Sequence, residues 1–164
     1  MLERFYPDEC AESAYDIDYD ALYKEGYRGI IYDIDNTLVP HGAPADERAK
    51  ELFAALRSTG YSTLVLSNNK EPRVKSFADD VGAMYIYKAS KPFRSGYARA
   101  VSMLGTDTGS TLFIGDQLFT DVWGAKRCGI RNILVKPIDK KEEIQIVLKR
   151  YLERIVMYFY RKSH

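Results

Sequence analysis

From Gly29 onward, short apolar runs alternate with amphipathic stretches along the chain. The first run, residues 29–35, is β-branched and aromatic, as a strand buried on both faces would be. A helix is then expected over 46–59, because Asp46 suits the N-cap, apolar residues share one face, and Gly60 follows the end. The same alternation continues with strands at 61–66, 83–87, 111–115 and 132–135 and helices at 72–82, 92–104, 118–128 and 140–160.

Repeated strand-helix-strand units need right-handed crossovers and place helices on both faces of a mainly parallel sheet. The pattern therefore predicts an α/β fold with three layers, of the Rossmann-like kind. We expect a single domain over 1–164, because neither an internal repeat nor a linker interrupts the chain. Its expected parts are an N-terminal extension at 1–28 with a helix near 18–25, a core at 29–135 and a C-terminal amphipathic helix within 136–164.

Composition narrows the class of protein. Of 164 residues, 46% are hydrophobic and 29% charged, which is a globular balance. No run approaches the ~20 apolar residues of a membrane span, and the N-terminus lacks an apolar leader, so a cytoplasmic protein is expected. A net charge of +1 does not indicate nucleic-acid binding, although residues 136–164 carry eight basic and only four acidic side chains.

Polar side chains follow four of the predicted strands at their carboxyl ends, where ligands collect in parallel sheets. Carboxylates held close together repel one another unless a cation or a shared proton intervenes, and hard oxygen ligands suit Mg²⁺. A lysine at the same edge suits a fixed positive charge beside a phosphoryl group. The residues in question are Asp33 and Asp35 with Thr37, then Ser67 and Asn68, then Lys91, and finally Asp116 with Asp121.

These residues carry a family resemblance. Asp33 to Thr37, Ser67, Lys91-Pro92 and the segment from Gly115 to Asp121 resemble motifs one to four of the haloacid dehalogenase (HAD) superfamily, in order and in position. The whole chain is similar, more narrowly, to the YqeG family of type IIIA phosphatases. Related eukaryotic members of that branch are phosphatidylglycerophosphate phosphatases. The resemblance implies the HAD core fold and a phosphomonoester hydrolase.

The resemblance also implies a role for each residue. Asp33 would be the nucleophile that forms an aspartyl-phosphate, and Asp35 the acid that protonates the leaving oxygen and then the base that activates water. Ser67 would bind phosphoryl oxygens, and Lys91 would neutralise their charge. Mg²⁺ would be bound by Asp33, Asp116, Asp121 and the Asp35 carbonyl. Thr37 and Asn68 would support the loop or the substrate phosphate.

The motif spacing leaves little room for a cap domain, which HAD enzymes insert between motifs one and two or two and three. Here 34 residues separate Asp33 from Ser67, and 24 separate Ser67 from Lys91. A capless site is therefore expected. The resemblance to the eukaryotic members implies phosphatidylglycerophosphate as the specific substrate. A protein, nucleotide or sugar phosphate remains open, as does a phosphoacceptor or binding scaffold without turnover, although receiver domains lack an acid placed like Asp35.

Several features have a structural alternative. Asp16-Ile17-Asp18 repeats the Asp-Ile-Asp triplet, but no strand precedes it, so helix capping is favoured. His41 is expected to be a solvated loop residue, and Asp121 could be only a first-turn helix acid. The end of the C-terminal helix, residues 155–160, is apolar almost all round. Docking on the core, contact with another subunit in a homo-oligomer and peripheral contact with a membrane all remain open for it.

Overall fold

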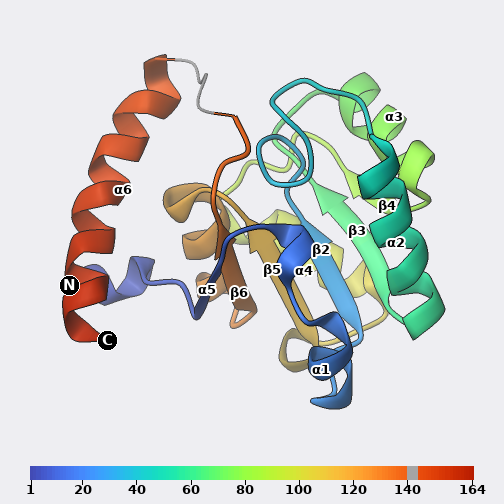
Figure 1. The fold of residues 1–164 in the computed structure, drawn as a ribbon, viewed down its shortest axis with the longest axis horizontal. Coiled ribbons are helices and arrows are strands. Elements are labelled where there is room, and N and C mark those ends of the chain that lie inside the picture. Colours follow the sequence, from blue (N-terminus) through green and yellow to red (C-terminus); the bar gives the residue numbers. More distant parts are fainter. Residues whose placement is uncertain (140–143) are drawn as a thin grey trace.

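In the described part of the chain, six parallel strands form one sheet in the order β1-β6-β5-β2-β3-β4 (Figure 1). The computed structural model describes residues 1–139 and 144–164, with side chains from 147 in the second range. The α/β prediction is confirmed, including the helices on both faces. The strands are β1 (Glu9–Ala11), β2 (Gly29–Tyr32), β3 (Ser62–Leu66), β4 (Met84–Ile86), β5 (Thr111–Gly115) and β6 (Arg131–Val135). The α-helices are α1 (Tyr19–Lys24), α2 (Glu47–Thr59), α3 (Glu71–Val81), α4 (Arg94–Leu104), α5 (Trp123–Arg127) and α6 (Ile144–Ser163).

The central strand β2 is buried on both faces because successive side chains point to opposite sides of the sheet. Ile30 and Tyr32 belong to the core that holds Phe53 of α2. Ile31 belongs to the opposite core, together with Tyr97 of α4. A continuous apolar run, rather than an alternating one, is what such a strand requires.

The capping contacts that the sequence predicts at the helix ends are present in the structure. The Asp46 carboxylate accepts a hydrogen bond from the Ala49 amide at 2.8 Å, and Gly60 ends α2 with φ of +118°, a value that glycine adopts without strain. The Asp18 carboxylate accepts from the Ala21 amide at 3.0 Å. The second Asp-Ile-Asp triplet thus supplies a helix cap, as expected.

Several elements differ from the sequence-based expectation: the first core strand ends at Tyr32 rather than at 35, and the last helix ends at Ser163 rather than at 160. Residues 1–28 contain the edge strand β1, which pairs in parallel with β6, in addition to the expected helix. The segment expected to be one helix over 118–128 begins with a π-helical turn, Leu118–Val122, and continues as α5. The start expected for the last helix, 140–143, lies outside the described residues.

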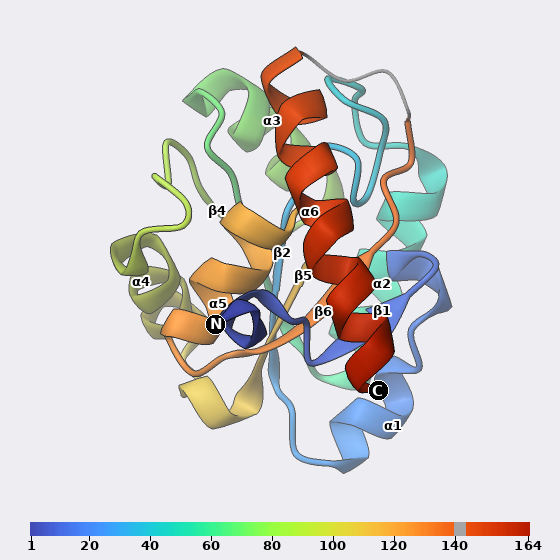
Figure 2. The same ribbon diagram turned by 90° about the vertical axis from the view of Figure 1, so that its left-hand side faces the viewer.

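Helix α6 crosses the β6 side of the molecule (Figure 2). Its inner face reaches a small apolar cluster in which Val156 is buried with Tyr6 and Leu118. Of the side chains described on this helix, from residue 147 onward, seven large apolar ones are nevertheless exposed: Val147, Leu148, Tyr151, Leu152, Ile155, Tyr158 and Phe159. Docking on the core therefore accounts for one face of α6 only. Within the described ranges, no helix is long and apolar enough to span a bilayer.

Candidate active site

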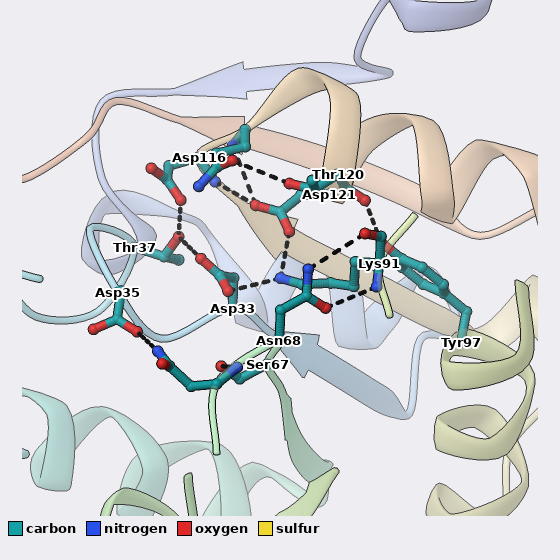
Figure 3. A network of polar contacts seen from close by, with 12 residues as sticks. Asp33, Asp35, Thr37, Ser67, Asn68, Lys91, Tyr97, Asp116, Thr120 and Asp121 are labelled. Carbon is teal, nitrogen blue, oxygen red and sulfur yellow. Dashed lines mark hydrogen bonds and ion pairs between the residues drawn. The ribbon is translucent and has the colours of Figure 1, made fainter. Parts of the chain in front are cut away.

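The expected site residues meet at the carboxyl edge of the central strands (Figure 3). Asp33, Ser67 and Asp116 each directly follow a strand, β2, β3 and β5 respectively, and these three strands are neighbours. Lys91 comes from the loop between β4 and α4. All four side chains are buried. Topology alone thus brings together residues that lie up to 83 positions apart in the chain.

Lys91 is the positive centre of the site. Its Nζ lies 2.7 Å from Asp33 Oδ1 and 2.7 Å from Asp121 Oδ1. Asn68 holds the backbone of Lys91, because its Oδ1 accepts from the Lys91 amide at 2.7 Å and its Nδ2 donates to the Lys91 carbonyl at 3.3 Å. Burial alone would lower the pKa of Lys91, but Asp121 and Asp33 together raise it above its usual value. Lys91 is therefore a fixed cation.

Three buried carboxylates surround this lysine. One oxygen from each of Asp33, Asp116 and Asp121 lies within 4.8 Å of the others. The Thr37 hydroxyl links two of them, donating to Asp116 Oδ1 at 3.0 Å and lying 3.4 Å from Asp33 Oδ2. Burial raises the pKa of Asp33 to about 7 despite Lys91. One lysine leaves negative charge uncompensated, and a compact set of carboxylate oxygens is what Mg²⁺ requires. The donor set fits that ion.

The turn after β5 is held by Asp121, whose carboxylate folds back on it. Asp121 Oδ2 accepts from the Asp116 amide at 3.2 Å and the Gln117 amide at 3.1 Å, while Oδ1 binds Lys91. A Cβ on Gly115 would lie 2.5 Å from Asp121 Oδ2, so the close approach requires glycine there. Asp121 is a member of the π-helical turn, and its carboxylate is fully engaged by the site.

Asp35 faces away from this cluster. Its carboxylate accepts from the Gly42 amide at 2.7 Å, from Asn69 Nδ2 at 2.8 Å and from Arg73 Nη2 at 2.9 Å. Burial acts to raise the pKa of Asp35, but the Gly42 hydrogen bond and the Arg73 charge outweigh it and hold the pKa below its usual range. Ser67 Oγ accepts from the Asn69 amide at 3.1 Å. Asp35 and Ser67 therefore share Asn69 as a neighbour.

Two residues of α6 reach the site and were not expected there. Arg150 donates to the backbone carbonyl and to Oδ2 of Asp116, and it pairs with Glu153 Oε2 at 3.0 Å. Glu153 Oε1 accepts from the Leu118 amide at 2.8 Å. Arg73 was also missed. One signal for α6 is visible in the sequence, since Glu153 is the sole acid between 144 and 163 and lies three residues after Arg150.

The raised pKa of Asp33 predicts an unusual dependence of stability on pH in the metal-free protein. An unfolded aspartate binds its proton near pH ~3.9, whereas folded Asp33 does so at about 7. The folded state therefore binds more protons between these values, so this contribution to stability is complete below about pH 4 and is lost as the pH rises through 7. In urea unfolding with EDTA, Asp33 alone should make the free energy of unfolding lower at pH 8 than at pH 5 by roughly 2 kcal/mol, and Asp116 and Asp121, whose pKa burial raises to about 6, should add to the change in the same direction.

Asp33→Asn is the matched control for this measurement, because it removes the titrating group and keeps its shape. Its stability should depend less on pH between 5 and 8 than that of the wild type. A wild-type stability that is constant or rises over this range would contradict the pKa of Asp33.

Comparisons with known proteins identify the family of the chain. The haloacid dehalogenase-like hydrolase family model matches residues 41–129, which include Ser67, Lys91 and Asp116. The chain is 38% identical over its whole length to the probable phosphatase YqeG of Bacillus subtilis, covering 97% of that protein. It is 27% identical to phosphatidylglycerophosphate phosphatase 1 of Arabidopsis thaliana, over 84% of this chain and 45% of that one.

Solved structures support the fold. The cobalt-bound deoxy-D-mannose-octulosonate 8-phosphate phosphatase of Haemophilus influenzae superposes with a TM-score of 0.56 at 16% identity, over 69% of this chain and 80% of that one. The sheet, the strand-end motifs and the full-length match to a phosphatase point the same way. The chain therefore belongs to the haloacid dehalogenase-like hydrolases and is one of their phosphatases.

Proposed function

We propose that this phosphatase is Mg²⁺-dependent and acts through an aspartyl-phosphate on Asp33. The observation that carries the proposal is the buried cluster of Asp33, Asp116 and Asp121 around Lys91. Of the two acids of the Asp-Ile-Asp triplet, Asp33 contacts Lys91 and belongs to the buried cluster, whereas Asp35 lies toward Gly42 and Arg73. This separation gives the two acids of the Asp-Ile-Asp triplet different tasks.

In the first step, a carboxylate oxygen of Asp33 forms a bond to phosphorus while the bond from phosphorus to the leaving oxygen breaks. Asp35 gives its proton to that leaving oxygen. In the second step, Asp35 takes a proton from water, the water oxygen binds phosphorus, and the bond to Asp33 breaks to release phosphate. Because the pKa of Asp35 is held low, the group starts as a carboxylate and must take up a proton before the first turnover, after which the second step returns the proton that the first step gave away.

The other residues hold the loops of the site in position and neutralise its charges. Mg²⁺ held by Asp33, Asp116 and the Asp35 carbonyl would supply charge stabilisation to the phosphoryl oxygens. Lys91 compensates Asp33 and Asp121, Ser67 lies at the end of β3 for hydrogen bonding to a phosphoryl oxygen, and Thr37 and Asn68 keep the loops in place. Asp121 supports Lys91 and the turn that carries Asp116.

We further propose that the substrate is a lipid phosphate, specifically phosphatidylglycerophosphate, presented at an anionic membrane surface. Two plant and algal relatives carry that activity in their names. The exposed apolar side chains of α6 are bordered by basic ones, and a surface hollow is lined by Arg154, Met157, Tyr158, Arg161 and Lys162. The sole acid of the helix, Glu153, is buried. An apolar stripe with a positive border complements an anionic bilayer.

A panel of substrates tests both the Mg²⁺-dependent phosphatase reaction and the lipid substrate. We expect Mg²⁺-dependent phosphate release from an aryl phosphate, and a higher kcat/KM for phosphatidylglycerophosphate in anionic vesicles than for sugar phosphates, nucleotides or phosphopeptides. The double variant Leu148→Ser/Leu152→Ser should lower vesicle binding and lipid turnover more than about tenfold, because two leucines lose an apolar partner. Its rate on the aryl phosphate should remain at the wild-type level.

Met103→Ser is the matched control, since Met103 is an exposed apolar residue of α4, away from α6. Substitution is preferable to truncation of α6, because Glu153 and Val156 on the inner face are buried. Equal lipid turnover in wild type and double variant would refute the membrane role. A preference for a soluble phosphate would refute the lipid substrate while leaving the phosphatase reaction intact.

A further inference from the structure

Among the described side chains of helix α6, Arg150 and Glu153 contact the catalytic centre. The Arg150 side chain is 15% exposed and that of Glu153 9%, while the Asp116 carboxylate they approach is fully buried. The pair is thus enclosed between the helix and the turn after β5. Neither residue belongs to the four motifs at the strand ends, and α6 lies at the far end of the chain from Asp33.

The two side chains bind both ends of one short segment. Arg150 donates to the carbonyl and to Oδ2 of Asp116, which fixes the backbone and the carboxylate of the same residue. Glu153 accepts from the Leu118 amide, two residues further on. The 3.0 Å ion pair between Arg150 and Glu153 then joins these contacts. Residues 116–118 are consequently held from outside the sheet.

The contacts from α6 occupy one carboxylate oxygen of Asp116, Oδ2, and leave the other, Oδ1, facing the site. Oδ2 is taken by Arg150, whereas Oδ1 faces Thr37, whose hydroxyl also lies 3.4 Å from Asp33 Oδ2. Arg150 therefore orients the carboxylate so that one oxygen points toward the other acids. Because Glu153 neutralises Arg150, the pair adds orientation without adding net positive charge beside a cation site.

We propose that Arg150 and Glu153 are positioning residues that set Asp116 for Mg²⁺ binding, so that docking of α6 completes the metal site. The proposal rests on the proposed function, since it concerns the same Mg²⁺. Residues that orient a metal ligand raise affinity for the ion, and their loss typically costs about 10–100-fold in affinity or activity. The α6 helix would then act on both sides, its inner face on the metal ligand and its outer face on the membrane.

The test uses the double variant Arg150→Met/Glu153→Gln, which removes both charges, keeps the arginine stem and leaves an acceptor for the Leu118 amide. The variant also leaves the buried Asp116 carboxylate without its charged partner, so the metal-free unfolding midpoint should fall below that of wild type, and the titration is done at a temperature where circular dichroism shows both proteins folded. Calorimetric titration with Mn²⁺, a probe that needs no turnover, should give a Kd about 10–100-fold higher than wild type. The concentration of Mg²⁺ for half-maximal activity should rise in the same proportion.

Lys50→Met/Glu47→Gln is the matched control, because it removes an ion pair of the same spacing on α2, far from the site, and should leave the Kd for Mn²⁺ unchanged. Arg150→Lys, which can reach only one of the two Asp116 acceptors at a time, should give an intermediate Kd. If the double variant is folded and binds Mn²⁺ as tightly as wild type, or more tightly, the positioning role is wrong. If wild type itself does not bind Mn²⁺, the proposed Mg²⁺ dependence fails instead.

Discussion

Asp33→Asn is expected to lower the rate of phosphate release from any phosphomonoester by at least about 10⁴-fold, because an amide cannot form the acyl-phosphate bond. The variant should remain folded. It removes one of three clustered buried carboxylates, and Lys91 keeps Asp121 as its partner at 2.7 Å. We therefore expect the metal-free variant to have an unfolding temperature at pH 8 equal to or above that of wild type. Phosphate release and thermal unfolding, measured on the same preparation, check both expectations.

Asp16→Asn is the matched control for this loss. It changes the same position of the other Asp-Ile-Asp triplet, whose first acid is exposed, and should leave turnover unaltered. Asp35→Asn separates the roles of the two acids at the site. With an aryl phosphate, whose leaving group needs no proton, the first step should proceed and the second should be slowed about 10²–10⁴-fold, so that phosphorylated enzyme accumulates. Comparable residual turnover in the Asp33 and Asp16 variants would exclude Asp33 as the nucleophile.

Removal of divalent cations is expected to have the second large effect. EDTA should reduce phosphate release to background, and excess Mg²⁺ should restore it. The physical reason is the accumulation of carboxylates, since Lys91 and Arg150 together cannot compensate Asp33, Asp116, Asp121, Glu153 and an incoming phosphate. Binding of Mg²⁺ to the folded state should also raise stability, by about 2.7 kcal/mol when free Mg²⁺ is 100 times its Kd.

Asp116→Asn distinguishes a specific site from a general effect of ionic strength. The variant should need more Mg²⁺ for half-maximal activity and should show a smaller thermal shift with Mg²⁺, whereas both proteins should respond equally to KCl. Full activity of the wild type in EDTA, together with an unfolding temperature that Mg²⁺ does not change, would rule out the metal dependence.

The central part of the site was predictable from sequence because its residues directly follow apolar runs. Asp33, Ser67 and Asp116 occupy the first position after a buried strand, and parallel topology then brings them together whatever the loops do. The helix boundaries at Asp46 and Gly60 were predictable for a similar reason, since the cap and the positive φ are local requirements.

Features that depend on tertiary contact were not predictable. β1 has three residues, none of them fully buried, so it carries no hydrophobic pattern and exists through pairing with β6. The π-helical turn after β5 coincides with hydrogen bonds that the carboxylates of Asp121 and Glu153 accept from backbone amides. Glu153 belongs to α6 and lies 35 positions after its partner, Leu118. The low pKa of Asp35 likewise depends on Arg73, which belongs to no motif.

In the C-terminal helix, the hydrophobic pattern predicts the exposed apolar surface but not the charged contacts with the core. Its sequence indicated more apolar surface than one docking face can bury, and Leu148, Tyr151 and Tyr158 are indeed exposed. The pattern gave no reason, however, to place a charged pair against the core. The Arg150 and Glu153 contacts arise because α6 packs beside the turn that carries Asp116, a placement that no local rule specifies.

The role of Asp33 as the nucleophile is tested most directly by identifying the residue that carries the phosphoryl group. The Asp35→Asn variant is mixed with Mg²⁺ and an aryl phosphate and quenched in acid. Borohydride then reduces any acyl-phosphate, and peptide mass spectrometry locates the reduced residue. We expect conversion of Asp33 to homoserine, and no conversion when Asp33 is also changed to Asn. Modification at another residue, or turnover with no trapped phosphoryl group on Asp33, would contradict it.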